Sequence, residues 1–426
     1  MRGSHNTLKK ILAEALREFP LEDYVKAGIR SLGSPRRCTI AALGKSSVRM
    51  ARAALEVVEP DGGIAVTPHG TGARIQGLEV VEAGHPVPDE NSIRAGMALL
   101  EWARSSNCLL ALVSGGGSSL AELPYDPITL EDLVEANRLL LESGAPIHEI
   151  NAVRKHISRI KGGRLAKEAK GRVIGVYVSD VPGDRLESIA SGPTVPDSTT
   201  YKDALEAIRR YRLEGRMPES IMKVLTEGAM GLRPETPKPG DPSLQGRVSN
   251  TLAAANKDIL SLVAGKVASH GYNAVMLTSM LQGESREAGR VLASIAMDAI
   301  SNGIPGKPPL ALVAGGETTV TVRGGGRGGR NMELVYSIAL EAWRMGYEGI
   351  LAAAVDTDGI DGNTPAAGAV AGPGDIEGVV GMGLEPWRPL EENDTYSVFE
   401  RLGRLIVTGP TGLNLNSIVV VLVDGG

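Results

Sequence analysis

The segment Cys108-Leu-Leu-Ala-Leu-Val-Ser-Gly-Gly-Gly-Ser-Ser119 is an apolar run that leads directly into three glycines and two serines. A short apolar run that ends in glycine indicates a buried strand followed by a tight loop, where backbone amides can approach an anion. A tight turn with a serine helix cap explains the same residues equally well. The segment predicts a strand, and it makes Ser114, Gly115, Gly116, Gly117, Ser118 and Ser119 candidate phosphate-binding residues.

Similar apolar runs alternate with helical patterns through the N-terminal half. Helices are expected at segments such as 92–104 and 130–142, and strands at 38–43, 63–67, 78–83, 108–113 and 173–178. Short, nearly continuous apolar strands between helices are typical of a mostly parallel sheet covered on both faces. We therefore expect an α/β fold that opens with a Rossmann-like domain.

The C-terminal half predicts a second α/β domain. Helices are expected at 251–270, 283–302 and 331–345, and strands at 274–278, 310–314, 318–323, 350–355, 405–408 and 418–423. The 318–323 run alternates polar and apolar residues, which favours an antiparallel strand and hence a mixed sheet. The proline-rich segment 228–247 has the composition of a linker. We expect a nucleotide-binding domain at 1–237, a second domain at 238–426, and an active site in the cleft between them.

Composition narrows the class of protein. The 426 residues suit two domains, and a net charge of -5 without basic runs argues against nucleic-acid or membrane partners. No apolar stretch approaches the roughly 18 residues that span a bilayer, and the chain starts without an apolar signal segment. Cys38 and Cys108 each open an apolar strand, so we interpret them as core residues rather than a disulfide or metal pair. These features favour a cytoplasmic enzyme, monomeric or homodimeric.

Lys45 follows another predicted strand, in Leu43-Gly44-Lys45-Ser46. The segment imitates the end of a P-loop, but Thr39 occupies the place of the first P-loop glycine. A lysine at a helix start opposes the helix dipole, so an anionic ligand is a good reason for its presence. A surface lysine is the alternative.

The segment 151–194 combines cations with acidic groups. Arg154 and Lys161 precede a strand that ends in Ser179-Asp180, and Asp184 follows a Val-Pro-Gly turn. Phosphoryl transfer to an alcohol needs positive charge for a triphosphate and a carboxylate for a metal or a hydroxyl proton. The alternative is a solvated basic helix followed by an ordinary turn.

Two segments of the C-terminal half carry further candidates. Gly324–Gly329 fits the dinucleotide pattern G-x-G-x-x-G, but the alternating run before it does not suit a buried first strand. Arg323, Arg327 and Arg330 make it a candidate clamp for phosphate or carboxylate. Asp356, Asp358 and Asp361 follow an apolar strand and could hold Mg²⁺ or stabilise a turn. Ala367 stands where a calcium loop would need its final glutamate.

Five motifs together resemble one family, the glycerate 2-kinases whose C-terminal half is called the MOFRL domain. They are 84–89 (Gly-His-Pro-Val-Pro-Asp), 114–119, 151–194, 315–317 (Gly-Gly-Glu) and 356–362 (Asp-Thr-Asp-Gly-Ile-Asp-Gly), in the family's order. The resemblance implies ATP-dependent phosphorylation of the 2-hydroxyl of D-glycerate, with Mg²⁺, to give 2-phosphoglycerate.

The residues and the resemblance together give each candidate a role. The resemblance carries the family's functional lysine onto Lys45. We expect catalytic roles for Lys45, Arg154, Asp180 and Arg330, and nucleotide or phosphate binding for residues 114–119 and Lys161. Substrate or supporting roles fall on His85, Asp89, Asp184, Glu317, Asn331 and Asn414, and metal binding on Asp180, Asp356 and Asp358. Leu413 and Ser417 replace a threonine and an aspartate of the family's closing motif, which puts ligand contacts at those positions in doubt.

Two other functions compete with the kinase. Proteins of this family have been described as hydroxypyruvate reductases, but a reductase needs a sound dinucleotide fingerprint. A non-catalytic nucleotide sensor would not need Lys45, Arg154, Asp180, Glu317 and Arg330 together.

Overall fold

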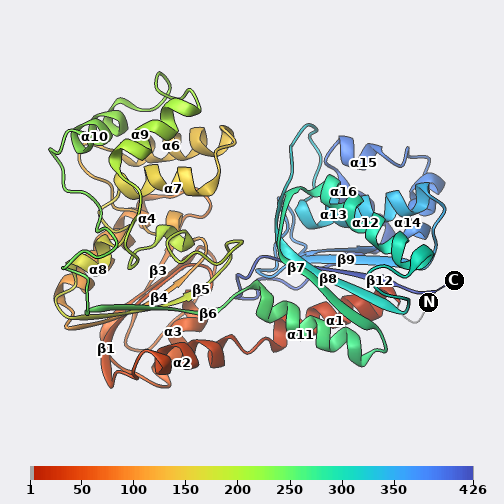
Figure 1. Cartoon of the computed structure of the whole chain (residues 1–426), viewed down its shortest axis with the longest axis horizontal. Helices are drawn as coiled ribbons and strands as arrows, with labels where there is room; N and C mark the ends of the chain where they lie inside the picture. Colours follow the sequence, from red (N-terminus) through yellow and green to blue (C-terminus); the bar gives the residue numbers. More distant parts are fainter. Residues whose placement is uncertain (1–3, 426) are drawn as a thin grey trace. The chain divides into compact units, whose positions relative to one another are not determined.

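The protein, described by a computed structural model over residues 4–425, forms two compact α/β units. Each unit contains a six-stranded sheet with helices on both faces (Figure 1). The N-terminal unit comprises residues 20–179 and 184–254. The C-terminal unit comprises residues 4–19, 180–183 and 255–425.

The sheet of the N-terminal unit is entirely parallel, as predicted, with the order β3-β2-β1-β4-β5-β6. Its strands are β1 (Arg37–Leu43), β2 (Glu59–Pro68), β3 (Glu79–Ala83), β4 (Cys108–Ser114), β5 (Arg172–Val178) and β6 (Val248–Ala254). This is the strand order of doubly wound nucleotide-binding folds. The sequence did not predict β6. This strand lies at the edge of the sheet and pairs only with β5, so its residues do not form an apolar run, and its last residues fall within the helix predicted at 251–270.

Helices flank this sheet on both faces. α2 (Leu21–Ser31) and α3 (Ser47–Leu55) lie on one face, and α4 (Glu90–Ser105) lies on the other (Figure 1). The short α5 (Gly117–Leu120) and α8 (Arg164–Glu168) follow the glycine-rich loop and the basic segment, and η1 (Ile189–Ser191) is a single 3-10 turn. A separate helical layer with its own apolar core consists of α6 (Leu130–Glu142), α7 (Ile147–His156), α9 (Tyr201–Arg210) and α10 (Glu219–Ala229).

The segment 228–247 differs from the expected linker, because it packs on the N-terminal unit. Thr236 is buried and donates to Asp197, while Arg164 donates to the carbonyl of Pro234. The segment starts with the end of α10 and continues through turns near 239–247, such as the bond from the Leu244 amide to the Asp241 carbonyl. The last crossing between the units lies at Ala254–Ala255, and earlier crossings lie at 19/20, 179/180 and 183/184, so the compact units do not follow the expected ranges 1–237 and 238–426.

The C-terminal unit contains the expected mixed sheet, with the order β11-β10-β9-β12-β8-β7. Among the strands within residues 4–425 of this unit, only β7 (Asn273–Glu284) and β8 (Leu310–Thr319) pair in parallel. The others are β9 (Ile350–Asp356), β10 (Gly368–Ala371), β11 (Leu405–Ile406) and β12 (Ser417–Val423). The predicted strand 318–323 is wrong, since β8 continues to Thr319 and a loop follows. The short β10 was not anticipated.

Helices from both ends of the chain cover this sheet. α1 (His5–Glu18) and α11 (Asn256–Ser269) lie on one face, and α12 (Ser285–Asn302) and α13 (Arg330–Arg344) lie on the other (Figure 1). α14 (Pro373–Gly381), α15 (Arg388–Glu391) and α16 (Thr395–Leu402) complete the unit. α1 buries Leu8, Ile11, Leu12, Ala15 and Leu16, which is why the first helix of the chain belongs to the second unit.

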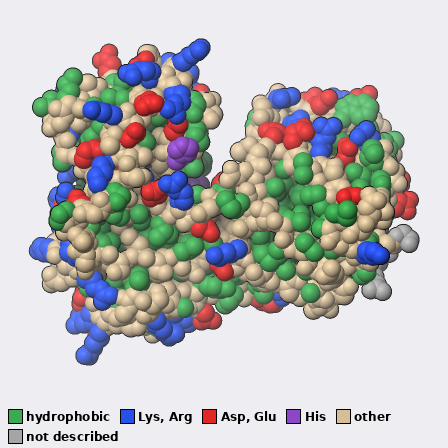
Figure 2. All heavy atoms as spheres, viewed as in Figure 1, with side chains coloured by type: hydrophobic (Ala, Val, Ile, Leu, Met, Phe, Trp, Pro, Cys, Tyr) green, Lys and Arg blue, Asp and Glu red, His purple; other side chains and the backbone are tan. Residues whose placement is uncertain are grey.

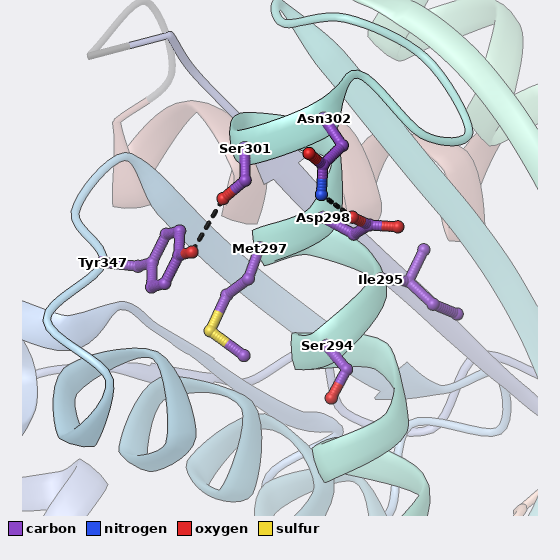
Figure 3. Close-up of a pocket in the computed structure, with 7 residues that line it drawn as sticks. All are labelled: Ser294, Ile295, Met297, Asp298, Ser301, Asn302 and Tyr347. Atoms are coloured by element: carbon purple, nitrogen blue, oxygen red, sulfur yellow. Dashed lines mark hydrogen bonds between the residues drawn. The ribbon is translucent and has the colours of Figure 1, made fainter.

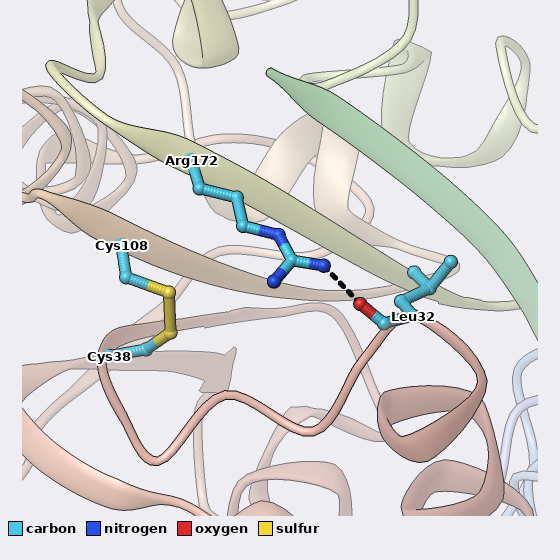
Figure 4. The surroundings of a disulfide bond; sticks show 4 residues. All are labelled: Leu32, Cys38, Cys108 and Arg172. Atoms are coloured by element: carbon cyan, nitrogen blue, oxygen red, sulfur yellow. Dashed lines mark hydrogen bonds between the residues drawn. A yellow bond between two sulfur atoms is a disulfide. The ribbon is translucent and has the colours of Figure 1, made fainter. Parts of the chain in front are cut away.

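The interpretation of Cys38 and Cys108 as separate core residues is wrong. They form a disulfide between β1 and β4, with their Cα atoms 4.7 Å apart (Figure 4). Both residues open neighbouring parallel strands, and the register Thr39↔Leu109 places them directly opposite each other. The pairing could not be read from the separate strands. In the chain-entropy description, closing a loop of 70 residues stabilises the fold by about 4 kcal/mol.

The surface carries charges of both signs (Figure 2). On the face shown in Figure 2, basic and acidic side chains are interspersed over both units. Within residues 4–425, no helix is long and apolar enough to cross a membrane.

Candidate functional site

The glycine-rich loop after β4 lies beside the loop after β1. The backbone amide of Lys45 donates to the carbonyl of Gly115 (2.9 Å), and the amide of Ser46 donates to the hydroxyl of Ser114 (3.0 Å). β1 and β4 are the pair at which the strand order of the sheet reverses. In open α/β sheets, ligands bind at the carboxyl ends of the strands at this point.

Lys45 and His85 approach the same glycine. A Cβ atom placed on Gly116 would lie 3.0 Å from His85 Cδ2 and 3.2 Å from Lys45 Cγ. Gly116 also has φ +80°, so a side chain there would be both crowded and strained. The backbone at Gly116 therefore passes close to a lysine and a histidine side chain, which is compatible with anion binding at this loop.

Asp89 holds the segment that contains His85 through hydrogen bonds. It begins α4 by accepting the Ser92 amide (2.9 Å), and it accepts from His69 Nε2 (2.6 Å). Burial raises the pKa of Asp89, but its hydrogen bonds with His69, Ser92 and Gly84 outweigh burial and lower it. Asp89 is thus a capping residue that fixes the loop in place.

Lys161 lies behind the glycine-rich loop. Its ammonium donates to the Ser118 carbonyl (2.8 Å) and pairs with Glu122, and both side chains are 3% exposed. Burial lowers the pKa of Lys161, and Glu122 opposes that shift. Arg154 is half-buried nearby, donates to Asn137 Oδ1 (2.8 Å) and interacts electrostatically with Glu122.

A chain of hydroxyl and amide groups joins the loop to the segment 188–192. Ser118 Oγ lies 2.8 Å from Ser191 Oγ, which donates to Asn151 Oδ1 (3.0 Å). Ala190 and Ser191 have φ of 48° and 57°, a region that side chains rarely adopt. Such strain needs surrounding contacts to hold it, and it concentrates at functional sites. Asp184 also has a positive φ of 55°.

In the C-terminal unit, Arg330 joins two carboxylates. Its guanidinium donates to Glu317 Oε1 (2.7 Å) and to Asp356 Oδ2, at the ends of β8 and β9. Burial would lower the pKa of Arg330, but Asp356 and Glu317 raise it overall. One cation and two anions leave this trio with a net negative charge.

Asp180 lies in the same unit, next to the closing motif. Asn414 Nδ2 donates to Asp180 Oδ2 (2.8 Å), and Asn416 Nδ2 donates to the Asp180 carbonyl. Because Ser417 pairs with Asp356, these asparagines bring Asp180 toward the end of β9, where Asp358 accepts the Ile360 amide (2.9 Å). Leu413 is fully buried, so that departure from the family motif serves packing.

Asp361 caps the helix that carries Arg330. It accepts the amides of Asn331 (3.1 Å) and Met332 (2.9 Å), and also the side chain of Asn331 (3.2 Å). Burial raises the pKa of Asp361 to about 7, against the lowering effect of the two amides. Asn331 is buried, and its side-chain amide supports this cap.

Several backbone amides of the loop Gly324–Gly329 donate to neighbouring segments of the same unit. Asn393 Oδ1 accepts the amides of Arg323 and Gly324, and the amides of Gly326, Arg327 and Gly328 donate to Glu392 O, Asp394 Oδ1 and Asn363 Oδ1. A dinucleotide pyrophosphate needs such amides for itself. The glycines instead allow close packing, since a Cβ on Gly329 would lie 2.3 Å from Asp361 Cγ.

A pocket of about 500 Å³ on α12 does not coincide with these residues. Ser294, Ile295, Met297, Asp298, Ser301, Asn302 and Tyr347 line it (Figure 3). Its only charged lining residue is an aspartate, which is unsuited to an anionic substrate. Among residues 4–425, no three histidine, cysteine or acidic side chains are grouped so that they could hold a metal ion.

The structure thus assembles the candidates in two groups, one in each unit. The N-terminal unit contains Lys45, His85, Asp89, residues 114–119, Arg154, Lys161 and Asp184. The C-terminal unit contains Asp180, Glu317, Arg330, Asn331, Asp356, Asp358 and Asn414. Sequence analysis missed Glu122, although a lone carboxylate within Leu120–Leu123 was a signal that a buried partner was needed.

Comparison with known proteins agrees with this architecture. Residues 6–226 match a domain of unknown function (DUF4147), and residues 310–417 match the MOFRL family. The chain is 43% identical to a glycerate 2-kinase of Pyrococcus horikoshii (90% of this chain, 87% of the relative) and 42% identical to a putative hydroxypyruvate reductase of Agrobacterium vitis (91% and 87%). The crystal structure of a glycerate kinase from Thermotoga maritima superposes with a TM-score of 0.82 at 38% identity, covering 98% of this chain and 100% of that one.

Proposed function

The chain belongs to the MOFRL family of glycerate kinases, and we propose that it transfers the γ-phosphoryl group of ATP to the 2-hydroxyl of D-glycerate. The observation that carries the proposal is the convergence of Lys45 and His85 on Gly116, at the point where the parallel sheet reverses its strand order. Phosphoryl transfer depends mainly on positioning and on charge stabilisation, which such a site supplies.

The N-terminal group binds the nucleotide in this proposal. Lys45 neutralises the transferring phosphate, and the backbone of Gly115–Gly117 follows the phosphate oxygens. Ser114 holds the two loops together through its hydrogen bond with Ser46, so its part is structural. Arg154 and Lys161 add positive charge from behind the loop.

The C-terminal group acts on the acceptor and the metal in the same reaction. The net negative charge of the Arg330 trio suits a divalent cation that arrives with phosphate, because Mg²⁺ usually takes one or two protein carboxylates plus substrate oxygens. Asp180 and Asp358 would hold it, and the ion would neutralise phosphate charge. Alternatively, Asp180 accepts the proton of the glycerate hydroxyl.

Asp180→Asn separates these two roles. Turnover falls in both cases, but only the loss of a metal ligand also raises the Mg²⁺ concentration needed for half-maximal activity. A variant with normal turnover would remove Asp180 from both roles.

The reductase function lacks support from the geometry, since the amides of Gly324, Gly326, Arg327 and Gly328 already donate to protein acceptors. The deciding experiment supplies ATP with D-glycerate and follows ADP, with the product identified by phosphorus NMR. A parallel assay supplies NADH or NADPH with hydroxypyruvate and follows absorbance. We expect ADP and 2-phosphoglycerate. Only 3-phosphoglycerate, or no ADP above the glycerate-free rate, would overturn the proposal; nucleotide binding without either reaction would identify a sensor.

A further inference from the structure

Glu122 is a buried carboxylate to which no role has been given so far. It follows α5, is 3% exposed, and pairs with Lys161 Nζ. The same ammonium donates to the Ser118 carbonyl (2.8 Å) within the glycine-rich loop. Glu122 therefore reaches the proposed phosphate site only through Lys161 and does not line that site itself.

Glu122 and Lys161 depend on each other. Both side chains are 3% exposed, and burying either charge without compensation is costly. Arg154 interacts electrostatically with both groups, but its side chain is half-buried and donates to Asn137 Oδ1 (2.8 Å). Glu122 is therefore the buried carboxylate that compensates the ammonium beneath the loop.

The backbone of Glu122 is held independently of the loop. Its amide donates to the Ser92 carbonyl at the start of α4 (3.0 Å). A Cβ on Gly96 of the same helix would lie only 2.1 Å from the Glu122 carbonyl oxygen, so the two backbones are in direct contact. The backbone of Glu122 is thus fixed against α4, so its carboxylate can hold Lys161 in one position.

We propose that Glu122 is a positioning residue that keeps Lys161 charged and fixed beneath Ser118, so that the loop presents its surface to a nucleotide phosphate. The inference rests on the proposed function for the identity of the anion. Glu122 touches no substrate and acts through Lys161. Without the carboxylate, a buried ammonium beside Arg154 gives up its proton or moves, and its bond to the loop is lost.

The test compares Glu122→Gln, Lys161→Met and the double variant. Thermal midpoints report stability, calorimetric titration with ADP reports binding, and turnover is measured with ATP and glycerate. Each single variant should bind ADP about 10-fold more weakly, because the loop loses one well-placed charged contact. The double variant removes both buried charges, so it should regain stability while its ADP affinity stays about 10-fold low. If Glu122→Gln does not fold, the ADP affinity of the double variant is compared with that of the wild type instead.

Glu227→Gln is the matched control. It removes a carboxylate from a half-buried ion pair of the same unit, Arg233 Nε to Glu227 Oε2 at 2.7 Å, and should leave ADP affinity unchanged. A double variant with wild-type ADP affinity would overturn the inference and leave the pair as structural. Loss of ADP affinity in Glu227→Gln equal to that in Glu122→Gln would also overturn it. Absence of glycerate-dependent ADP release by the wild type would overturn the proposed function alone, since binding is measured separately.

Discussion

Two glycine-rich segments of the chain, 114–119 and 324–329, look alike in sequence and differ in what surrounds them. The first follows a central parallel strand at the reversal of strand order, with Lys45 and His85 beside it. The second follows the end of β8 and donates its amides to Asn393, Asp394, Asn363 and the carbonyl of Glu392. Glycine spacing therefore indicates close backbone packing. Whether a ligand can bind the backbone amides depends on the position of the loop in the sheet and on whether those amides already have protein partners.

The largest effect should come from Lys45→Ala, which removes the cation beside the first segment. Loss of a group that stabilises charge in the transition state typically lowers the rate on the order of 100-fold, so we expect that fall in kcat/KM. Steady-state kinetics with ATP and D-glycerate measure it, and circular dichroism checks the fold. Near-normal turnover by a folded variant would show that Lys45 has no role in the mechanism. The first glycine-rich segment would then have no functional advantage over the second.

A smaller effect should follow Gly117→Ala in the same segment. The new Cβ would lie 2.7 Å from Ala190 Cβ and 2.9 Å from Leu43 Cγ, so the loop must shift. A displacement below 1 Å at a positioned site should lower kcat/KM about 10-fold. Gly215→Ala in the same unit is the control, since none of the described atoms lies within 4 Å of its Cβ. Equal kinetics for the two variants would show that the loop's backbone position does not matter.

The sequence predicted the parts of the fold that rest on apolar periodicity. The parallel sheet, the mixed sheet and the long helices α12 and α13 were confirmed, because continuous apolar strands and helical spacing report burial directly. The strand β6 was missed, since at an edge its pairing with β5 outweighs a weak local pattern. The proline-rich segment 228–247 was predicted to be a linker, because composition does not reveal what prolines pack against.

The candidate site shows the same limit. Lys45, His85 and residues 114–119 were marked by motifs, and the structure brings them together. Their buried support could not be read from motifs, because it comes from residues distant in sequence: Glu122 with Lys161, and Ser118 with Ser191 and Asn151. The disulfide between Cys38 and Cys108 is a similar case, since it depends on the order of strands across 70 residues.

The smallest effect on the reaction should come from Gly326→Ala in the second segment. Its new Cβ would lie 2.4 Å from Asp394 Cβ and 2.6 Å from the Glu392 carbonyl oxygen, so packing there is disrupted. Overpacking of this kind costs about 1–3 kcal/mol of unfolding free energy. Because the amides of Gly324, Gly326, Arg327 and Gly328 already donate to protein acceptors, nucleotide KM should change less than about 2-fold at a temperature well below the melting point. The adjacent Gly325→Ala is the matched control, since none of the described atoms lies within 4 Å of its Cβ, and it should change neither quantity. A selective rise in nucleotide KM for Gly326→Ala, without loss of stability, would mean that the second segment also binds phosphate and that the two glycine-rich loops are functionally alike.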